Sequence, residues 1–141
     1  MRSHFPVAVH LIIRQGDQIL LLRRFNTGYQ DGNYGLVAGH VDAGESVRQA
    51  AAREGLEEAG IRIDPEDVEV AHVTHRKSND ERFDFFVYIK AWEGEIRNME
   101  PDKCDDLSWF PLACPPVNLI AHVRLALENY QKGIFYSEHG W

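Results

Sequence analysis

The 141-residue sequence has little cysteine, little basic charge and no long apolar run. Its two cysteines, Cys104 and Cys114, are too few for a disulfide framework, so we expect free, buried thiols in a reducing compartment. No apolar run approaches membrane length, and the N-terminal residues lack the charged and apolar regions of a secretory signal. We therefore expect a cytoplasmic protein that does not enter a membrane.

The scarcity of basic charge excludes a further class of function. Fifteen Lys and Arg stand against 22 Asp and Glu, which gives a formal net charge of −7. Binding nucleic acid as a polymer requires a basic surface, so the composition argues against it. A small nucleotide held through a metal ion remains compatible. At this length we expect a single domain, residues 1–141, with a real hydrophobic core.

The most informative stretch runs from Gly39 to Ile61, GHVDAGESVRQAAAREGLEEAGI. Its glycine-bounded loop leads to Ser46, a good N-cap, and Gln49 three residues later completes a capping-box pattern. Gly60 suits a C-cap that requires a left-handed residue. The pattern predicts a helix from Val47 to Ala59.

Three carboxylates, Glu54, Glu57 and Glu58, lie near the end of this helix. At about 100° per residue, Glu54 and Glu58 continue the apolar stripe of Val47 and Ala51. They should face protein, although acids on a solvated helix face are common. Adjacent like charges repel, and a hard divalent cation bound by oxygen ligands would offset that repulsion.

The same stretch resembles a Nudix box. In one-letter code, with x for any residue and h for a hydrophobic residue, the pattern of that box is Gx₅Ex₇REhxEExGh. The matching residues are Gly39, Glu45, Arg53, Glu54, Glu57, Glu58, Gly60 and Ile61. Seven of these are polar or glycine positions, each matched by chance about 7% of the time, so they coincide on the order of once in 10⁸ starting positions. Gly55 departs from the pattern, because the family usually has an aliphatic residue there.

The resemblance implies an α/β fold of the Nudix type, an α/β/α sandwich with a central mixed β-sheet. It also implies hydrolysis of a nucleoside diphosphate linked to another group. Glu57 and Glu58 are implied as ligands of Mg²⁺ or Mn²⁺, and Glu54 as a metal ligand or the base that activates water. Glu45 and Arg53 are implied to brace the loop against the helix. A bound metal would polarise the phosphorus and lower the pKa of its water.

Two further residues extend the implied metal site. Gly39 retains the last glycine of a family segment that is usually Pro-Gly-Gly, and its carbonyl is implied as a ligand. The WEGE run that begins at Trp92 resembles MutT-type nucleoside triphosphate pyrophosphohydrolases, and this resemblance implies Glu100 as a further metal ligand. The alternative for Glu100 is an ordinary exposed acid in an acidic loop.

Four residues are candidates for substrate binding. A CPPVN segment ending at Asn118 resembles a MutT-type segment whose asparagine reads a guanine-type base, and an amide that donates and accepts suits this role. Asn118 could also cap a helix predicted for Leu119–Gln131. Tyr29 and Tyr34, in a loop rich in turn signals, could stack on a base or fix the loop to the core. Arg23, at a strand end, could meet phosphates or be solvated.

Several β segments around the box helix also indicate an α/β sandwich with a mixed sheet. The strand-like runs are Pro6 to Ile13, Gln18 to Arg24, Leu36 to Asp42, Val68 to His75, Arg82 to Trp92 and Leu107 to Leu112. The first two, joined by a tight turn, are expected to form a hairpin. His72 and His75 lack a ligand partner at a fixed spacing, so we interpret them as structural histidines.

The favoured function is hydrolysis of a nucleoside triphosphate, with an oxidised purine as a candidate base, to monophosphate and pyrophosphate. The alternatives are a nucleotide sugar, ADP-ribose or another diphosphate, and a catalytically silent nucleotide-binding sensor domain. Lys77 and Ser78 stand where ADP-ribose and dinucleoside polyphosphate hydrolases tend to have proline or tyrosine. The expected partner is a small nucleotide, and the chain is expected to be a monomer or a homodimer.

Overall fold

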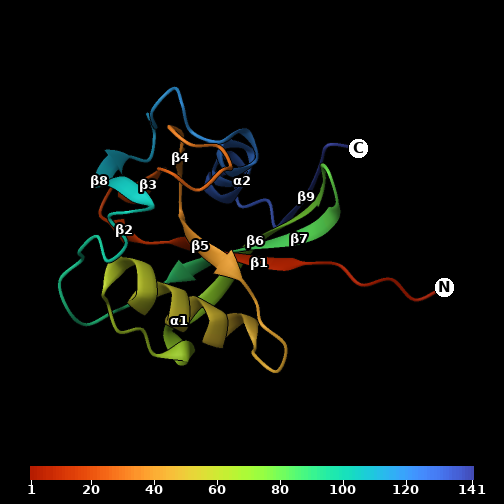
Figure 1. Ribbon diagram of the computed structural model, residues 1–141, viewed down its shortest axis with the longest axis horizontal. Coiled ribbons are helices and arrows are strands. Elements are labelled where there is room, and N and C mark those ends of the chain that lie inside the picture. The colour runs from red at the N-terminus through yellow and green to blue at the C-terminus, as the bar shows by residue number, and fades with distance from the viewer.

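The computed structural model describes residues 1–141, and its larger sheet has five strands in the order β5-β1-β7-β6-β9 (Figure 1). The strands are β1 (Val7–Ile12), β5 (Val37–His40), β6 (Val68–Lys77), β7 (Glu81–Ile89) and β9 (Tyr136–His139). β1 pairs with β7 in parallel and with β5 antiparallel, while β6 pairs with β9 in parallel. The sheet is therefore mixed, as expected.

A second, antiparallel sheet forms around β3. Its strands are β2 (Arg14–Gln15), β3 (Gln18–Arg24), β4 (Tyr34–Gly35) and β8 (Cys104–Pro111). The expected hairpin between Pro6–Ile13 and Gln18–Arg24 is wrong, because the tight turn joins β2 to β3 while β1 lies in the other sheet. β1 is buried along almost its whole length, and this suits a strand with neighbours on both sides better than a two-stranded hairpin.

The two α-helices lie on opposite faces of the five-stranded sheet (Figure 1). α1 (Val47–Ala59) packs against β1, β5 and β6, and α2 (Ala121–Gln131) packs against β6 and β9. The α/β/α arrangement expected from the sequence is confirmed. A short 3-10 helix, η1 (Pro65–Asp67), precedes β6. Neither helix has the length and apolarity needed to cross a membrane.

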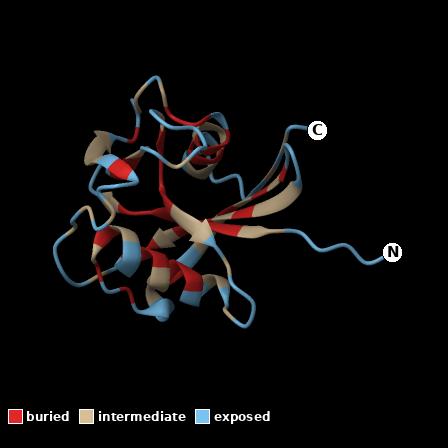
Figure 2. Cartoon of the chain, in the orientation of Figure 1, coloured by how far each residue is buried: buried red, intermediate tan, exposed pale blue.

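Alternation along β1 divides the core into two clusters. Val9 points to the α1 side, where it joins Ala51, and Ile12 points to the α2 side, where it joins Val123. Figure 2 shows the buried residues concentrated where strands meet helices. His10 lies two residues before Ile12 and shares its face of the strand, so a buried polar side chain enters the α2 side.

The C-terminal strand β9 was not expected from the sequence, and tertiary contacts hold it on the edge of β6. The ring nitrogens of fully buried His72 form hydrogen bonds of 2.8 Å with Ile134 O and Ser137 Oγ. The indole Nε1 of Trp141 donates to His75 O at 3.0 Å. A structural role for His72 is thereby confirmed.

Other expectations require smaller corrections. β6 extends to Lys77 and β7 begins at Glu81, so the connection between them is shorter than the predicted runs, which ended at His75 and began again at Arg82, had left. β7 ends at Ile89, so the whole WEGE run lies outside the strand. Both cysteines are free, as expected, but only Cys104 is buried. Cys114 is exposed because it follows the end of β8, outside both core clusters.

Candidate active site

Both ends of α1 form as the sequence predicts. The Ser46 hydroxyl accepts a hydrogen bond from Gln49 N at 3.1 Å, and Ser46 N donates to Gln49 Oε1 at 2.9 Å. Gly60 has a φ of 70°, in the left-handed region. These caps satisfy backbone groups that the helix itself leaves unpaired, and they fix where the carboxylates stand.

The departure from the Nudix box at Gly55 has a packing reason. A Cβ at this position would lie 2.5 Å from Ile63 Cδ1, closer than real atoms approach. Ile63 therefore fills the space that an aliphatic side chain at position 55 would need. The glycine that stands here in place of the family's aliphatic residue therefore affects only the buried side of α1, and the neighbouring carboxylates are unaffected.

Arg53 ties the loop to the helix. Its Nε donates to Glu45 Oε2 at 2.8 Å, and Nη2 donates to Glu45 Oε1 at 3.0 Å and to His40 O at 2.9 Å. Its Nη1 donates to Glu54 Oε1 at 2.7 Å and to Glu57 Oε2 at 3.3 Å. The hydrogen bond from Arg53, with one from Asp42 N, lowers the pKa of Glu45 to about 2. These contacts are the bracing that the sequence led us to expect.

Glu54, which is buried, and Glu58, which is half-buried, form a pair of carboxylates. Glu54 is only 8% exposed, and Glu58 accepts a hydrogen bond from Ala38 N at 3.2 Å. Burial, followed by its contact with Glu54 and the charge of Glu100, raises the pKa of Glu58 to about 9. Burial raises the pKa of Glu54 as well. Without a cation, the pair therefore retains a proton well above the pH at which a carboxyl normally loses it.

The oxygen atoms around this pair fit a hard divalent cation. A Cβ at Gly39 would collide with the Glu54 carboxylate, so only glycine allows the backbone of β5 to approach it. Carboxylate and carbonyl oxygens are the ligands that Mg²⁺ and Mn²⁺ prefer. In the conformation described, no three acidic, histidine or cysteine side chains converge closely enough to hold an ion. Glu57 is turned toward Arg53 and would have to swing away to contribute.

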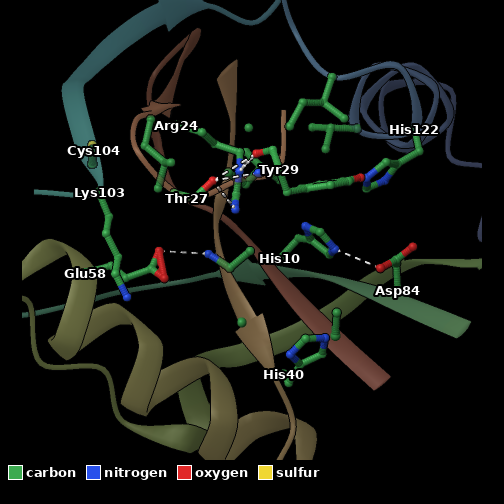
Figure 3. Close-up of a pocket in the computed structure, with 18 of the residues that line it drawn as sticks. His10, Arg24, Thr27, Tyr29, His40, Glu58, Asp84, Lys103, Cys104 and His122 are labelled. Atoms are coloured by element: carbon green, nitrogen blue, oxygen red, sulfur yellow. Dashed lines mark hydrogen bonds and ion pairs between the residues drawn. The ribbon is translucent and has the colours of Figure 1, made fainter. Parts of the chain in front are cut away.

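A cavity of about 500 Å³ lies between the two sheets and has two chemically different ends. The acidic end is formed by Glu58, Glu100 and the backbone at Gly39, with Lys103 beside them. The histidine end is formed by His10, Arg76, Asp84 and His122, with His40 and Arg82 nearby. Figure 3 shows Glu58 and Lys103 on one side of the close-up and His10, Asp84 and His122 on the other.

The histidine end is held together by one fully buried carboxylate. Asp84 shares a hydrogen bond of 3.0 Å with His10 Nε2 and accepts one of 2.6 Å from Arg76 Nε. Burial alone would raise the pKa of Asp84, but these two partners outweigh it and hold the pKa well below its usual value. The network links strands β1, β6 and β7 through their side chains.

The loop of residues 25–33 forms one wall of the cavity. Arg24 Nε donates to Tyr29 O at 2.6 Å, and the guanidinium lies 5.2 Å from the centre of the Tyr29 ring. The Asp31 carboxylate accepts hydrogen bonds from the backbone of Thr27 and Gly28. Tyr29 lines the cavity and remains 49% exposed, so its ring is accessible to a ligand.

Three predicted substrate-binding residues, Arg23, Tyr34 and Asn118, do not line this cavity. The first two are held by contacts elsewhere. Arg23 pairs with Asp105 at 2.7 Å. Tyr34 is buried in the α2-side core, where its hydroxyl contacts Asp106. A substrate-binding role for either would need another surface or a rearrangement, and stays a prediction.

Asn118 uses its amide to hold the loop 25–33. Its Nδ2 donates to Gly32 O at 2.8 Å. The alternative role as a helix cap is wrong, because α2 begins at Ala121 and Ile120 occupies the cap position without a side-chain hydrogen bond. A base-reading role for Asn118 stays a prediction, and it would fall to Oδ1 and the second N–H of Nδ2, because only one hydrogen of the amide is used by Gly32.

Sequence reasoning missed the polar residues of the histidine end and one basic residue of the cavity. They are His10, His40, Arg76, Arg82, Asp84 and His122, with Lys103. A signal was present for two of them. His10 interrupts the apolar run VAVHLI and Asp84 stands between Phe83 and Phe85, and a polar residue inside a strongly apolar strand calls for a buried partner.

Comparison with known proteins places this site in a family. The model of the NUDIX domain matches residues 4–124. The chain is 35% identical over 112 residues to the NAD-capped RNA hydrolase NudC of Pseudomonas aeruginosa, an alignment that covers 76% of the chain and 37% of the relative. The chain thus spans only about a third of the length of that curated relative.

Solved structures agree in fold. The MutT NUDIX hydrolase from Burkholderia pseudomallei superposes with a TM-score of 0.81 at 30% identity, covering 89% of this chain and 98% of that one. The ORF135 protein of E. coli superposes with a TM-score of 0.74 at 25% identity, covering 91% and 89%. Together with the carboxylates and glycines of the box in their expected places, these matches show that the chain belongs to the NUDIX family of hydrolases.

Proposed function

We propose that the protein hydrolyses a nucleoside diphosphate linked to another group in a metal-dependent reaction. The favoured substrate is a nucleoside triphosphate, with an oxidised purine as a candidate base, cut to monophosphate and pyrophosphate. The observation that carries the proposal is the pair of buried Glu54 and half-buried Glu58 beside Gly39, at the end of a cavity of about 500 Å³. A cavity of this size suits a nucleotide.

Glu54, Glu57, Glu58 and Glu100, with the carbonyl of Gly39, are the groups that would hold Mg²⁺ or Mn²⁺. The bound metal would polarise the phosphorus and neutralise charge on the leaving phosphate. Glu54 is the residue we assign to take the proton from the attacking water. Burial raises the pKa of Glu54, so its carboxylate binds a proton more strongly than an exposed one, and Arg53 Nη1 donates to Glu54 Oε1 at 2.7 Å and fixes its position.

Basic side chains on the cavity wall suit the phosphates. Arg24 and Lys103 both line the cavity, and Figure 3 shows Lys103 beside Glu58. The chain as a whole has a net charge of −7, so these local cations and a metal would together offset the charge of a polyphosphate. Glu45 and Arg53 would maintain the loop geometry during turnover.

A dinucleotide joined through a diphosphate is the second candidate substrate. The 35% identity to NudC, which is named an NAD-capped RNA hydrolase, favours it. The acidic surface charge argues for a small dinucleotide rather than a capped RNA polymer. Hydrolysis of such a substrate would give two monophosphates and no pyrophosphate.

The test is a product assay with Mg²⁺, repeated with Mn²⁺. The panel contains canonical and oxidised nucleoside triphosphates, NAD, nucleotide sugars, ADP-ribose and dinucleoside polyphosphates. Pyrophosphate released from a triphosphate supports the favoured reaction. Monophosphates from a linked diphosphate support the second candidate. Metal-dependent binding without any product would overturn both and indicate the silent sensor domain.

A further inference from the structure

His122 presents an unused hydrogen-bonding group in the cavity. The side chain comes from the first turn of α2, is only 6% exposed and lines the cavity at the histidine end. Its Nδ1 is buried and has no hydrogen-bond partner within the chain. A buried polar atom without a partner costs free energy, so its presence calls for an explanation such as a ligand.

The surroundings of His122 fix its ring in place. The ring meets His10 edge to face with the centroids 5.7 Å apart, and His10 in turn stacks on Phe86 at 4.5 Å. His10 is itself anchored by Asp84 and Arg76. His122 is thus presented by a rigid network that spans three strands and a helix.

The imidazole of His122 is uncharged. Burial, with the nearby charges of His10 and Arg76, lowers its pKa to about 3. A neutral imidazole offers one donor and one acceptor. It therefore suits the edge of an uncharged heterocycle better than a phosphate, which the basic residues near the acidic end already suit.

The wall opposite His122 suits a planar group. Figure 3 shows the side chains of Tyr29 and His122 pointing toward one another across the cavity. A ring held against the exposed face of Tyr29 would bring its edge toward the histidine end.

His75 shows that an unpartnered nitrogen is not sufficient by itself. Its Nε2 is also buried without a partner, and its ring stacks on Phe83 at 4.3 Å. His75 does not line the cavity. What distinguishes His122 is its position on the cavity wall, and His75 supplies a matched control.

We propose that His122 determines the base specificity of the enzyme, by one hydrogen bond from its neutral imidazole to the edge of the substrate's nucleobase. This inference rests on the proposed nucleotide hydrolysis. It assigns the diphosphate to the acidic end and the base to the histidine end. It also assigns base reading to α2 itself and leaves Asn118 to hold the loop 25–33.

The test compares three variants with the wild type across nucleoside triphosphates of the four bases. His122→Phe keeps a ring beside His10 but removes both nitrogens, His122→Asn keeps a polar group near the position of Nδ1, and His75→Phe is the control. We expect His122→Phe to reduce the ratio of kcat/KM between the best and worst base about tenfold. His122→Asn should retain part of the ratio, and His75→Phe all of it.

A binding measurement on the wild type makes the test independent of the variants' folding and of turnover. The ¹⁵N signals of His122 are followed by NMR while the 5′-monophosphates of the four nucleosides are added without metal. We expect Nδ1 or Nε2 of His122 to shift with the preferred base, while the signals of His75 stay unchanged. Unchanged His122 signals during saturable binding would overturn the inference.

The two proposals can fail separately. Wild-type base selectivity in a folded His122→Phe would overturn the role of His122 and leave nucleotide hydrolysis intact. Absence of turnover in the wild type would overturn the proposed function. The NMR titration would then still decide whether His122 contacts a base.

Discussion

The two ends of the cavity both bury charge, but they compensate for it differently. At the histidine end, Asp84 meets two partners from within the chain, His10 and Arg76. At the acidic end, Glu54 and Glu58 face each other, and burial raises the pKa of Glu58 to about 9. Burial also opposes ionisation of Asp84, but its two partners hold the pKa of that carboxyl low.

The difference separates a scaffold from a binding site. A buried charge that the chain itself neutralises stabilises one arrangement and needs nothing from outside. Two carboxyl groups that face each other away from water retain a proton between them unless a cation compensates their charge. We therefore interpret the histidine end as rigid support that presents His122, and the acidic end as the place where a cation is required.

The largest effect is expected from removing charge at the acidic end. Glu54→Gln or Glu58→Gln should reduce turnover by at least about a thousandfold, because the metal would lose a ligand or the water its base. Circular dichroism should show an unchanged fold. Glu128→Gln, an exposed glutamate on α2, is the control and should keep full activity. Wild-type turnover in Glu54→Gln would refute its assignment as the base.

The next largest effect is expected from breaking the internal compensation of the histidine end. Asp84→Asn leaves Arg76 buried without a counter-charge, so the free energy of unfolding should fall by about 3 kcal/mol. Urea denaturation measures the change. Asp80→Asn, which removes the partly exposed partner of Arg82, should cost about 1 kcal/mol or less. Equal costs for the two substitutions would contradict the scaffold interpretation.

A smaller effect tests the packing beneath the carboxylates. Gly55→Ala should gain up to about 1 kcal/mol of helix propensity but lose about 1–3 kcal/mol through the clash with Ile63. We expect a net loss in thermal or urea unfolding. In an Ile63→Val background the same substitution should cost less or stabilise, because the clashing Cδ1 is absent. A loss of the same size in both backgrounds would exclude Ile63 as the reason for the glycine.

The smallest effect is a difference in pH dependence at the histidine end. The pKa of His122 is lowered to about 3 in the folded chain, against an ordinary 6.5 when unfolded. Below pH 6.5 the unfolded chain takes up a proton that the folded chain refuses, so this residue's contribution to stability is lost as the pH falls from 6.5 toward 3.

His122→Phe removes this pH-dependent contribution to stability. The variant keeps the titratable and charged groups that face the side chain, which are His10, Arg76, Asp84 and His139. The free energy of unfolding of the wild type should therefore fall more steeply between pH 7 and pH 4 than that of the variant. Urea titrations at each pH measure both slopes, with His75→Phe as the control for loss of a histidine. Parallel slopes for wild type and His122→Phe would show that His122 titrates normally.

Much of the acidic end followed from local sequence. The cap residues Ser46 and Gly60 set the ends of α1, and the helical repeat placed Glu54 and Glu58 on the side of α1 that faces the protein, where Glu54 is buried and Glu58 half-buried. Each of these predictions concerns residues within one helix, where spacing alone determines geometry. The family resemblance, carried by the same residues, then added the fold and an expected reaction class, and the comparisons confirm the fold and the membership of the NUDIX family of hydrolases.

The tertiary structure decided what depends on distant segments. Local pattern joined β1 to β3, whereas pairing with β5 and β7 places β1 in another sheet. The sequence left open whether Tyr34 and Asn118 bind a base or serve the structure, and contacts with Asp106 and Gly32 give each a structural role. A side chain's partner 70 or more residues away cannot be read from its neighbours in the chain.

The histidine end shows the same division most clearly. His10, Asp84 and His122 come from β1, β7 and α2, and no motif links them in the sequence. The sequence by itself determined the helix that carries the carboxylates, because its pattern repeats every three or four residues along one element. Only the tertiary structure decided the second end of the cavity, because burial and pairing of these side chains exist only once the strands and α2 have come together.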